Sequence, residues 1–577
     1  MKLSSVILLL AIVLSCNSNT KKEFEFAGGT ITMCLENDPF TFIPFEADDY
    51  NSAEVLRQIM EGLVGFDAQS AKITPQIASE WKVSDNRLVY SFTLRNDIFF
   101  HTHADLSSTE DRTLTAKDVV ATFHKICSKN SNGNATSGYN LIFKETLKGA
   151  DEYFQGKAKT ITGIKTKGNV ITLTLLNKDD NFLAKLASVQ ASILPKKLID
   201  KDVLTDMIGT GPFMFNGQTK EEQTKISLIK NLEYYEVSAN GCKLPYLDGI
   251  DFVIENRKLE QLNMFENKDI DLILGLPTSR ITKMLEGRIE DFNASPPKLL
   301  LIKNPILVTN YYFFNMKDPR FQDPRVRQAF NYAINKNKLG REILRDQYDE
   351  LGIYGVVPPI VKDFRGYGFG QVKNYGYSFD PERAKKLLAD AGYPNGEGFG
   401  SVTLRFNIGD INSAVADEFS HQIYQVLGIN VNIDGSSFEQ LNEDALNGKG
   451  DIFRTAWAAD YPNPETFLNK FYGKHITGDT TEHSAINPAK YVNSQFDAYF
   501  EQAKQADKIS EKMTLYSKAE IELLKNPPII PLWYNGDLQI VHANVRNLHF
   551  NSLGIFDFKE VYKKDWTKEE YQKSITQ

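Results

Sequence analysis

The sequence predicts an α/β protein, because two kinds of periodicity occur along it. Some segments alternate apolar and polar residues, which is typical of a strand with one buried face. Others place apolar residues three and four positions apart, behind a residue that can cap a helix. Both kinds recur through the 577 residues, and interleaved strands and helices are typical of the α/β class.

Three segments in the first third of the chain predict strands. The segments 28–38, 87–100 and 168–177 alternate apolar with polar side chains. The third begins with Gly168 and Asn169, a pair that suits a hairpin turn. We therefore expect strands here, one of them in a hairpin.

Three further segments predict helices, each with a capping signal at its start. In 114–127, Thr115 and Asp118 have the spacing of a capping box. The segments 323–336 and 380–394 both begin with Asp-Pro. The aspartate can cap the helix, and proline suits the first helical position.

Length, charge and motifs limit the class of protein. A chain of 577 residues is too long for one core and indicates roughly two to four domains. Its formal charge of −8, without a basic stripe, argues against a nucleic-acid partner. No G-x-S-x-G, H-E-x-x-H or P-loop motif is present, so we predict no catalytic residue, no enzyme activity and no cofactor.

The N-terminus resembles a bacterial lipoprotein signal. Lys2 precedes an apolar run over 6–14, and the motif "VLSC" ends at Cys16. The run is too short for a stable membrane span. The resemblance implies a signal peptide over 1–15, a lipid on Cys16 and a polar tether over 16–27. An ordinary secretory signal cleaved nearby is the alternative.

The three other cysteines indicate no particular site. Cys34, Cys127 and Cys242 allow one disulfide and a free thiol, or no disulfide. The sequence has no C-x-x-C pair.

The segment "FRTAWAADYPNPETFL" (453–468) places two opposite charges among apolar residues. Arg454 and Asp460 are six residues apart, roughly 20 Å of extended chain, so they cannot pair unless the chain bends sharply. A charge that loses water without a partner costs several kcal/mol. Either each residue has its own ion pair, or both face a ligand that carries one charge of each sign.

Motifs along almost the whole chain after the signal resemble the extracellular solute-binding proteins of peptide-type ABC importers (family 5), in that family's order. The motifs are "EGL" (61–63), "ITPQIASEWKVSDNRLVYSFTLRNDIFFH" (73–101), "LTAKDV" (114–119), "GTGPF" (209–213), "LPYLDGI" (244–250), "FNMKDPRFQDPRVRQAFNYAINK" (314–336), "FDPERAKKLLADAGY" (379–393) and "WAADYPNPETFL" (457–468).

The resemblance implies a class II periplasmic-binding-protein-like fold, with two lobes, a hinge and an extra domain on the first lobe. The implied parts are domain I (24–62, 206–305 and 535–577), domain II (63–205) and domain III (306–534).

The segment 102–113 is longer than the family pattern, and we interpret it as a surface loop. Its region contains residues that could be drawn as a metal site: His101, His103, Asp105, Glu110 and Asp111. A polar surface loop needs no ligand, however, and we predict no metal.

The resemblance also implies a peptide site in the charged segment. The residue at the position of Asp460 binds the ligand's α-ammonium group, and the arginine at the position of Arg454 binds the carboxylate of a short peptide. An arginine forks onto a carboxylate with two hydrogen bonds. Ala456 and Ala458 would offer backbone groups to an extended ligand.

Two further parts of the site are expected. Trp457 either walls a side-chain pocket or belongs to the core. The stretch from Asp48 to Tyr50 is expected to face the charged segment, because it lies at the matching distance before "EGL".

The function implied by the resemblance is that of an ABC importer's substrate-binding lipoprotein. It would capture short peptides between its lobes and deliver them to permease subunits. It would be a monomer on the periplasmic or cell-surface side of a bacterial membrane, anchored at Cys16. The alternative is the same fold with a non-peptide solute, namely a nickel chelate, haem, an opine or an oligosaccharide.

Overall fold

The computed structural model describes residues 23–576, apart from 221–223, 278–279, 361–363 and 477–485. Strands and helices interleave along this part of the chain, which confirms the α/β class. The predicted strands are β1 (Thr30–Leu35), β5 (Val89–Leu94) and β7 (Val170–Thr174). A turn at Gly168, whose φ is 61°, joins β6 (Ile164–Lys167) to β7 as predicted.

The predicted helices also form where their caps place them. They are α3 (Ala116–Ile126), α10 (Pro324–Tyr332) and α13 (Pro381–Asp390). The side chains of Thr115, Asp323 and Asp380 accept hydrogen bonds from the backbone of the first turns. Thr115 and Asp118 form the complete capping box.

One mixed sheet of 11 strands runs through the molecule, in the order β15-β14-β16-β12-β17-β11-β1-β10-β9-β8, with β13 paired to β17. Its other strands are β8 (Phe213–Thr219), β9 (Lys225–Lys230), β10 (Gly249–Ile254), β11 (Leu272–Leu274), β12 (Leu299–Phe314), β13 (Glu350–Leu351), β14 (Val402–Asn407), β15 (Val431–Ser436), β16 (Ile452–Ala458) and β17 (Ile529–His542).

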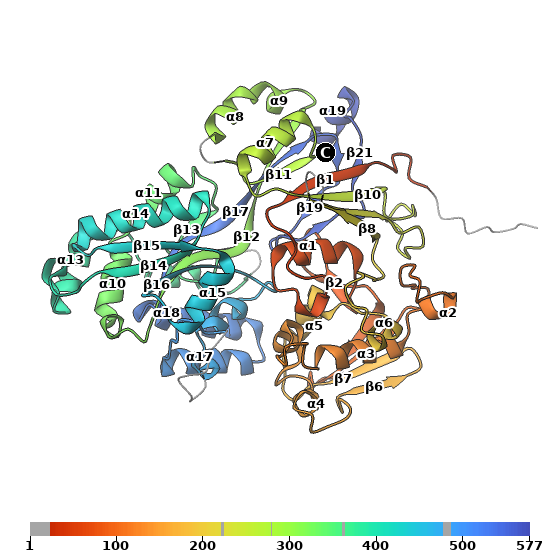
Figure 1. Cartoon of the computed structure of the whole chain (residues 1–577), viewed down its shortest axis with the longest axis horizontal. Helices are drawn as coiled ribbons and strands as arrows, with labels where there is room; N and C mark the ends of the chain where they lie inside the picture. The colour runs from red at the N-terminus through yellow and green to blue at the C-terminus, as the bar shows by residue number, and fades with distance from the viewer. Residues whose placement is uncertain (1–22, 221–223, 278–279, 361–363, 477–485, 577) are drawn as a thin grey trace, which may run out of the picture.

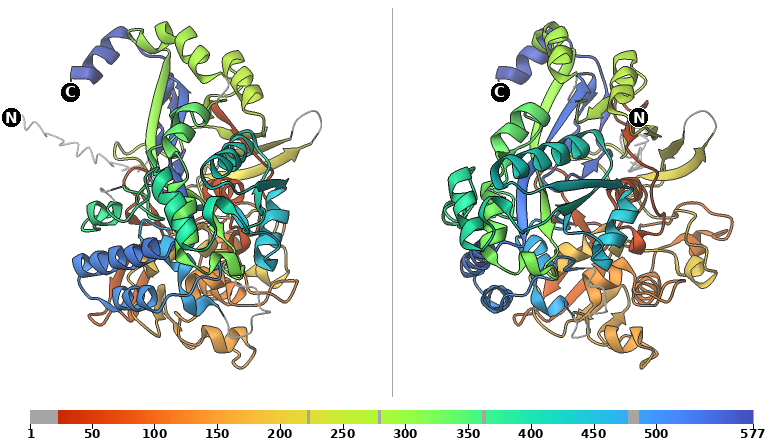
Figure 2. Two further views of the ribbon diagram at one scale, coloured as in Figure 1. Left: turned by 90° about the vertical axis from the view of Figure 1, so that its left-hand side faces the viewer. Right: turned by 60° about the vertical axis from the view of Figure 1, so that its left-hand side comes forward.

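Two strands of this sheet connect two lobes. β12 has 16 residues and β17 has 14. β17 pairs with β11 near one end, and β12 pairs with β16 near the other. We call the part with β1 and β8–β11 the first lobe and the part with β14–β16 the second lobe (Figure 1). Figure 2 shows β12 and β17 side by side along the height of the molecule.

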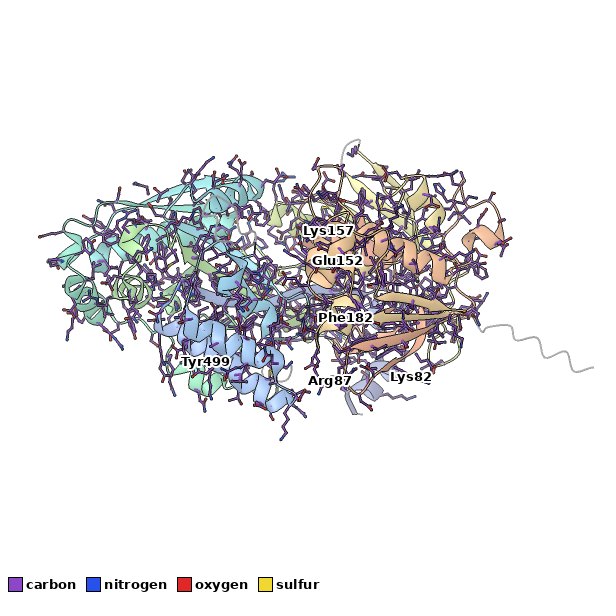
Figure 3. All side chains as sticks on the ribbon, turned by 90° about the horizontal axis from the view of Figure 1, so that it is seen from below. Lys82, Arg87, Glu152, Lys157, Phe182 and Tyr499 are labelled. Carbon is purple, nitrogen blue, oxygen red and sulfur yellow. The ribbon has the colours of Figure 1, made fainter. Side chains whose placement is uncertain are left out.

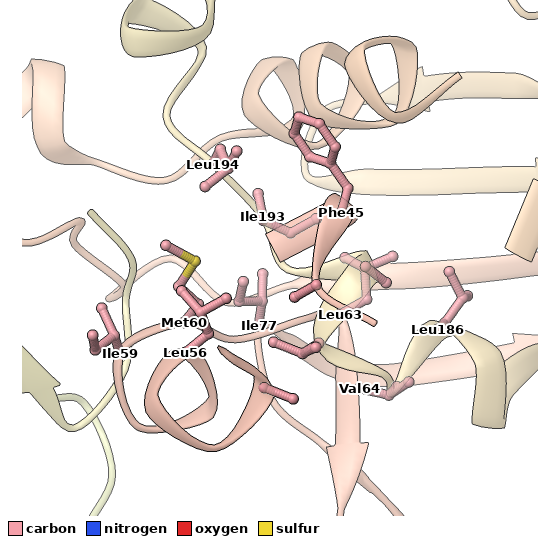
Figure 4. Close-up of a cluster of buried hydrophobic side chains, with 14 of the residues drawn as sticks. Phe45, Leu56, Ile59, Met60, Leu63, Val64, Ile77, Leu186, Ile193 and Leu194 are labelled. Atoms are coloured by element: carbon pink, nitrogen blue, oxygen red, sulfur yellow. The ribbon is translucent and has the colours of Figure 1, made fainter. Parts of the chain in front are cut away.

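A smaller sheet completes the first lobe. Its order is β4-β5-β7-β6, and β4 spans Ala78–Val83. Buried side chains pack it and its helices onto the rest of this lobe as one hydrophobic core, which includes Leu56, Ile77 and Leu186 (Figure 4). The remaining short strands are β2 (Val64–Phe66), β3 (Ile73–Pro75), β18 (Val545–Arg546), β19 (His549–Phe550), β20 (Phe556–Asp557) and β21 (Tyr562–Lys563).

Helices cover both lobes (Figure 1). The others of the first lobe are α1 (Tyr50–Ile59), α2 (Thr109–Arg112), α4 (Ala150–Phe154), α5 (Phe182–Leu186), α6 (Lys196–Asp200), α7 (Lys258–Asn267), α8 (Ile281–Gly287), α9 (Ile289–Asn293) and α19 (Lys568–Thr576). The others of the second lobe are α11 (Lys336–Lys338), α12 (Phe369–Lys373), α14 (Asp410–Leu427), α15 (Phe438–Asn447), α16 (Glu465–Leu468), α17 (Ser494–Gln505) and α18 (Ile509–Lys525).

The segment 102–113 differs in part from the expected surface loop. It contains the short helix α2, closed by a capping box between Ser108 and Asp111. The adjacent His101 is buried, with Nε2 3.0 Å from the carbonyl oxygen of Gly211, so the expectation of a polar surface position was wrong for this residue. In the described chain no three histidine, cysteine or acidic side chains gather as a metal site.

Cys34, Cys127 and Cys242 are buried free thiols, so of the two possibilities the structure has no disulfide among them. Cys16 and the predicted signal lie outside the described residues. Among the helices that are described, none has the length and apolar character needed to cross a membrane.

Charged side chains join the loop before α5 to the second lobe. Asp180 pairs with Lys512 on α18 at 2.6 Å and with Arg87 at 2.8 Å. Lys178 reaches Asp507, between α17 and α18, at 2.7 Å. Figure 3 shows Arg87 beside these helices. The two lobes are therefore in direct contact.

We expect Lys512→Met to favour a form in which the lobes are further apart. Lys512 is buried, and a hydrogen bond to a charged group contributes about 1.5–3 kcal/mol. Small-angle X-ray scattering of the ligand-free protein would detect a larger radius of gyration. Lys518→Met, on the exposed side of the same helix, is the control. Equal radii for wild type and both variants would show that this contact does not hold the lobes together.

Candidate functional site

The charged segment lies on a strand with one open edge. β16 pairs with β12 along its whole length, but with β14 only at Ile452 and Phe453. The amide of Ala459 donates to the carbonyl oxygen of Leu307 at 2.9 Å. Because hydrogen-bonded pairs alternate in an antiparallel ladder, the backbone groups of 454, 456 and 458 point away from β12, toward the open edge. The backbone groups of Ala456 and Ala458 therefore lie on the edge of β16 that no described strand covers.

Arg454 is held by two amides and by no carboxylate. Its guanidinium donates to Oδ1 of Asn407 at 3.0 Å and to Oδ1 of Asn310 at 2.9 Å. Its Nε is buried and has no hydrogen-bond partner. Burial lowers the pKa of Arg454 to about 10. The guanidinium is therefore fixed in place, while its charge has no counter-ion among the described residues.

Asp460 also lacks an ion pair within the described chain. Its Oδ2 accepts one hydrogen bond, from the hydroxyl of Thr466 at 3.2 Å. Burial raises its pKa, and the charges of Lys470, Lys185 and Arg57 oppose this rise. Arg454 is not among the charges that act on Asp460, in agreement with the expectation that these two residues do not satisfy each other.

Trp457 packs against the core of the second lobe, and its role as a pocket wall stays a prediction. Its Nε1 donates to the hydroxyl of Thr466 at 3.3 Å. One face of the ring carries the Lys470 ammonium group, with Nζ 3.3 Å from the ring centroid. The same threonine thus fixes Trp457 and contacts Asp460.

The first lobe contributes charges at the same place. Burial raises the pKa of Asp48, and the charge of Asp49 raises it further. The Lys470 ammonium group acts in the opposite direction and lowers this pKa. Asp49 caps α1 by accepting from the amide of Ser52 at 2.9 Å. Tyr50, the first residue of α1, is 45% exposed. Lys470 therefore interacts through charge with Asp460 of the second lobe and Asp48 of the first, and it brings the two predicted stretches together.

Three cations beside Asp460 were not predicted. Lys185 pairs with Asp179 at 2.7 Å. Arg57, on α1, has Glu54 as the carboxylate that acts on it most strongly. Lys470 follows Asp460 in the segment "ETFLNKF", where no spacing marks it as a site residue.

Comparison with solved structures identifies the class of protein. A periplasmic oligopeptide-binding protein from Borrelia burgdorferi has a TM-score of 0.76 and 25% sequence identity, over 93% of this chain and 100% of that one. The fold is thus the predicted class II periplasmic-binding-protein-like fold, with two lobes, a hinge and an extra domain on the first lobe.

The chain belongs to the bacterial extracellular solute-binding proteins, family 5, whose model matches residues 72–479. Haem-binding protein A of Haemophilus influenzae is 26% identical over 520 residues, covering 88% of this chain and 87% of that protein. The periplasmic oligopeptide-binding protein OppA of Escherichia coli is 24% identical over 503 residues, 86% of each chain. The family consists of solute-binding proteins and not of enzymes, as the sequence resemblance implies.

We expect Arg454→Met to change the thermal stability of the ligand-free protein little. The variant loses two hydrogen bonds, which destabilises the fold, but it also removes a charge without a counter-ion, which stabilises it. The net change in the free energy of unfolding is therefore expected to be within about 1 kcal/mol. Arg320→Met is the contrasting variant, because Arg320 pairs with Asp318 at 2.6 Å and with Asp451 at 2.8 Å. It is expected to lower the melting temperature clearly. Equal, large losses in both variants would contradict the view that Arg454 lacks compensation.

Proposed function

We propose that the protein captures short peptides between its lobes. Asp460 binds the α-ammonium group, and Arg454 binds the carboxylate of a short peptide. The observation that carries this proposal is the state of the two charges: both are fixed by neutral side chains, and neither forms an ion pair in the described chain. A zwitterionic ligand supplies the opposite charge to each.

The open edge of β16 supports an extended ligand. The free backbone groups at 456 and 458 lie between the two charges, so a peptide can pair with them as an added strand. Each peptide residue spans about 3.5 Å. The roughly 20 Å of strand between Arg454 and Asp460, reduced by the reach of both side chains, fits about two to four residues.

We further propose that the protein is the substrate-binding lipoprotein of an ABC importer. Cys16 carries the lipid, and the folded part delivers peptides to permease subunits as a monomer on the periplasmic or cell-surface side of the membrane. The "VLSC" motif and the family membership support this assignment.

Non-peptide solutes are the alternative for this fold. An oligosaccharide has no terminal charges and leaves Arg454 and Asp460 without partners. Haem carries carboxylates but no ammonium group, so it leaves Asp460 without one. Mass spectrometry of the material released from the purified protein by mild denaturation would identify the solute, including a nickel chelate or an opine.

We expect Asp460→Asn to weaken the binding of peptides of every length by about thirty-fold or more, because loss of one partner of a buried charge pair costs about 2–5 kcal/mol. Isothermal titration calorimetry measures the effect. N-acetylation of the peptide should weaken wild type but add little to the loss in the variant. Asp417→Asn, an exposed position on α14, is the control. Equal affinities of wild type and Asp460→Asn would exclude the anchoring role.

Arg454→Ala is expected to weaken di- and tripeptides most. A longer peptide carries its carboxylate beyond Arg454, so it loses less when the guanidinium, which can donate two hydrogen bonds to a carboxylate, is removed. A titration series from di- to hexapeptides compares the variant with wild type. A loss that is the same at every length would contradict the carboxylate assignment while leaving the role of Asp460 intact.

A further inference from the structure

Lys470 is a half-buried cation with unused hydrogen-bonding capacity. It lies in the short turn Asn469–Phe471, and its Nζ sits 3.3 Å from the centroid of the Trp457 ring. Burial lowers the pKa of Lys470 to about 8, and the carboxylates of Asp460 and Asp48 act against this change. Within the described chain the ammonium group makes no hydrogen bond or ion pair, although it carries three donors.

Lys336 and Lys512, which are buried, use their ammonium groups differently. Lys336 donates to the carbonyl oxygens of Gly352 at 2.6 Å and Tyr377 at 3.2 Å. Lys512 pairs with Asp180 at 2.6 Å. These two ammonium groups are satisfied by the fold, whereas that of Lys470 is positioned on an aromatic face and has acceptors to gain.

We propose that Lys470 determines the charge preference for the first side chain of the ligand. This inference rests on the proposed peptide function and deepens it. The α-ammonium group of a peptide at Asp460 arrives beside Lys470, which is therefore near the side chain of the ligand's first residue. A carboxylate on that side chain accepts from the free donors of Lys470, and a second cation is repelled.

The local charges are consistent with one cation from the ligand. Asp460 and Asp48 carry two negative charges, and Lys470 together with the ligand's α-ammonium group carries two positive ones. The neighbouring Lys185 has its own partner, Asp179. Among the carboxylates, Glu54 has the strongest charge interaction with Arg57. A further cation on the ligand would have no carboxylate left to pair with.

Two isosteric peptide pairs test the inference. The first pair is Glu-Ala-Ala and Gln-Ala-Ala. The second has norvaline or 2,4-diaminobutyrate before Ala-Ala, titrated at pH 6, where both amino groups of the latter are protonated. We expect wild type to prefer Glu over Gln, and norvaline over diaminobutyrate, each by about tenfold.

The variants separate the role of Lys470 from its contribution to folding. Lys470→Met should abolish both preferences, and Lys470→Arg, which keeps the charge, should retain them. Lys474→Met is the matched control, because Lys474 is exposed four residues later and pairs with Glu501 at 2.7 Å; it should behave like wild type. The melting temperature of each variant reports on its folding.

The outcomes distinguish this inference from the proposed function. If Lys470→Met keeps the wild-type preferences while Asp460→Asn still loses affinity, the role of Lys470 is wrong and the peptide function stands. If Lys470→Arg loses the preferences together with Lys470→Met, shape rather than charge is selected, and the inference is again wrong. If wild type binds none of these peptides, the proposed function fails and the inference fails with it.

Discussion

The continuity of β12 and β17 is the constraint on which the rest of the structure depends. β17 is hydrogen-bonded to β11 of the first lobe, and β12 is hydrogen-bonded to β16 of the second lobe. The two strands are also hydrogen-bonded to each other, so the lobes can move relative to each other only if this pair of strands bends or twists. The ladder between them is irregular between Pro305 and Thr309. A proline cannot donate to a ladder, so this is the place where bending disturbs the fewest hydrogen bonds. Within the two connecting strands, bending is therefore easiest between Pro305 and Thr309.

The same strands hold one end of the candidate site. Arg454 on β16 donates to Asn310 on β12, and Asn310 donates to Asn535 on β17 at 2.7 Å. Trp533 donates to the same oxygen of Asn535 at 3.0 Å. This chain of side chains crosses three neighbouring strands of the sheet, so a ligand carboxylate at Arg454 would act on groups that belong to the connection between the lobes. A contiguous network of this kind is a physical route by which binding can influence lobe position.

Local signals in the sequence predicted local structure, and long-range contacts explain what they missed. The capping box at Thr115 and the alternation in β1 depend on residues a few positions apart, so both could be predicted. The position of Lys470 beside Asp48 depends on two lobes that meet, and no spacing in the sequence encodes it. His101 looked like part of a polar loop, yet it is buried, and the distant carbonyl oxygen of Gly211 supplies the hydrogen-bond partner that its ring needs there. Arg454 and Asp460 stood out as candidate site residues because charges are unusual in an apolar segment and because the family motif surrounds them.

The balance of charges between the lobes favours a ligand as the missing component. Contacts such as Lys178–Asp507 are solvent-exposed, with 44% and 65% of their side-chain surface accessible, and pairs of this kind contribute about 0–1 kcal/mol. Opposing them, Arg454 has no counter-ion among the described residues, and Asp460 forms no ion pair there although three cations lie beside it. Partial burial of such charges costs more than burial of neutral groups would. The Lys512–Asp180 pair, in which Lys512 is buried, contributes more to contact between the lobes than these exposed pairs do. A molecule that supplies the opposite charge to Arg454 and to Asp460 removes the remaining cost in the form in which the lobes meet. Because it binds that form more tightly than the separated one, it shifts the population toward it.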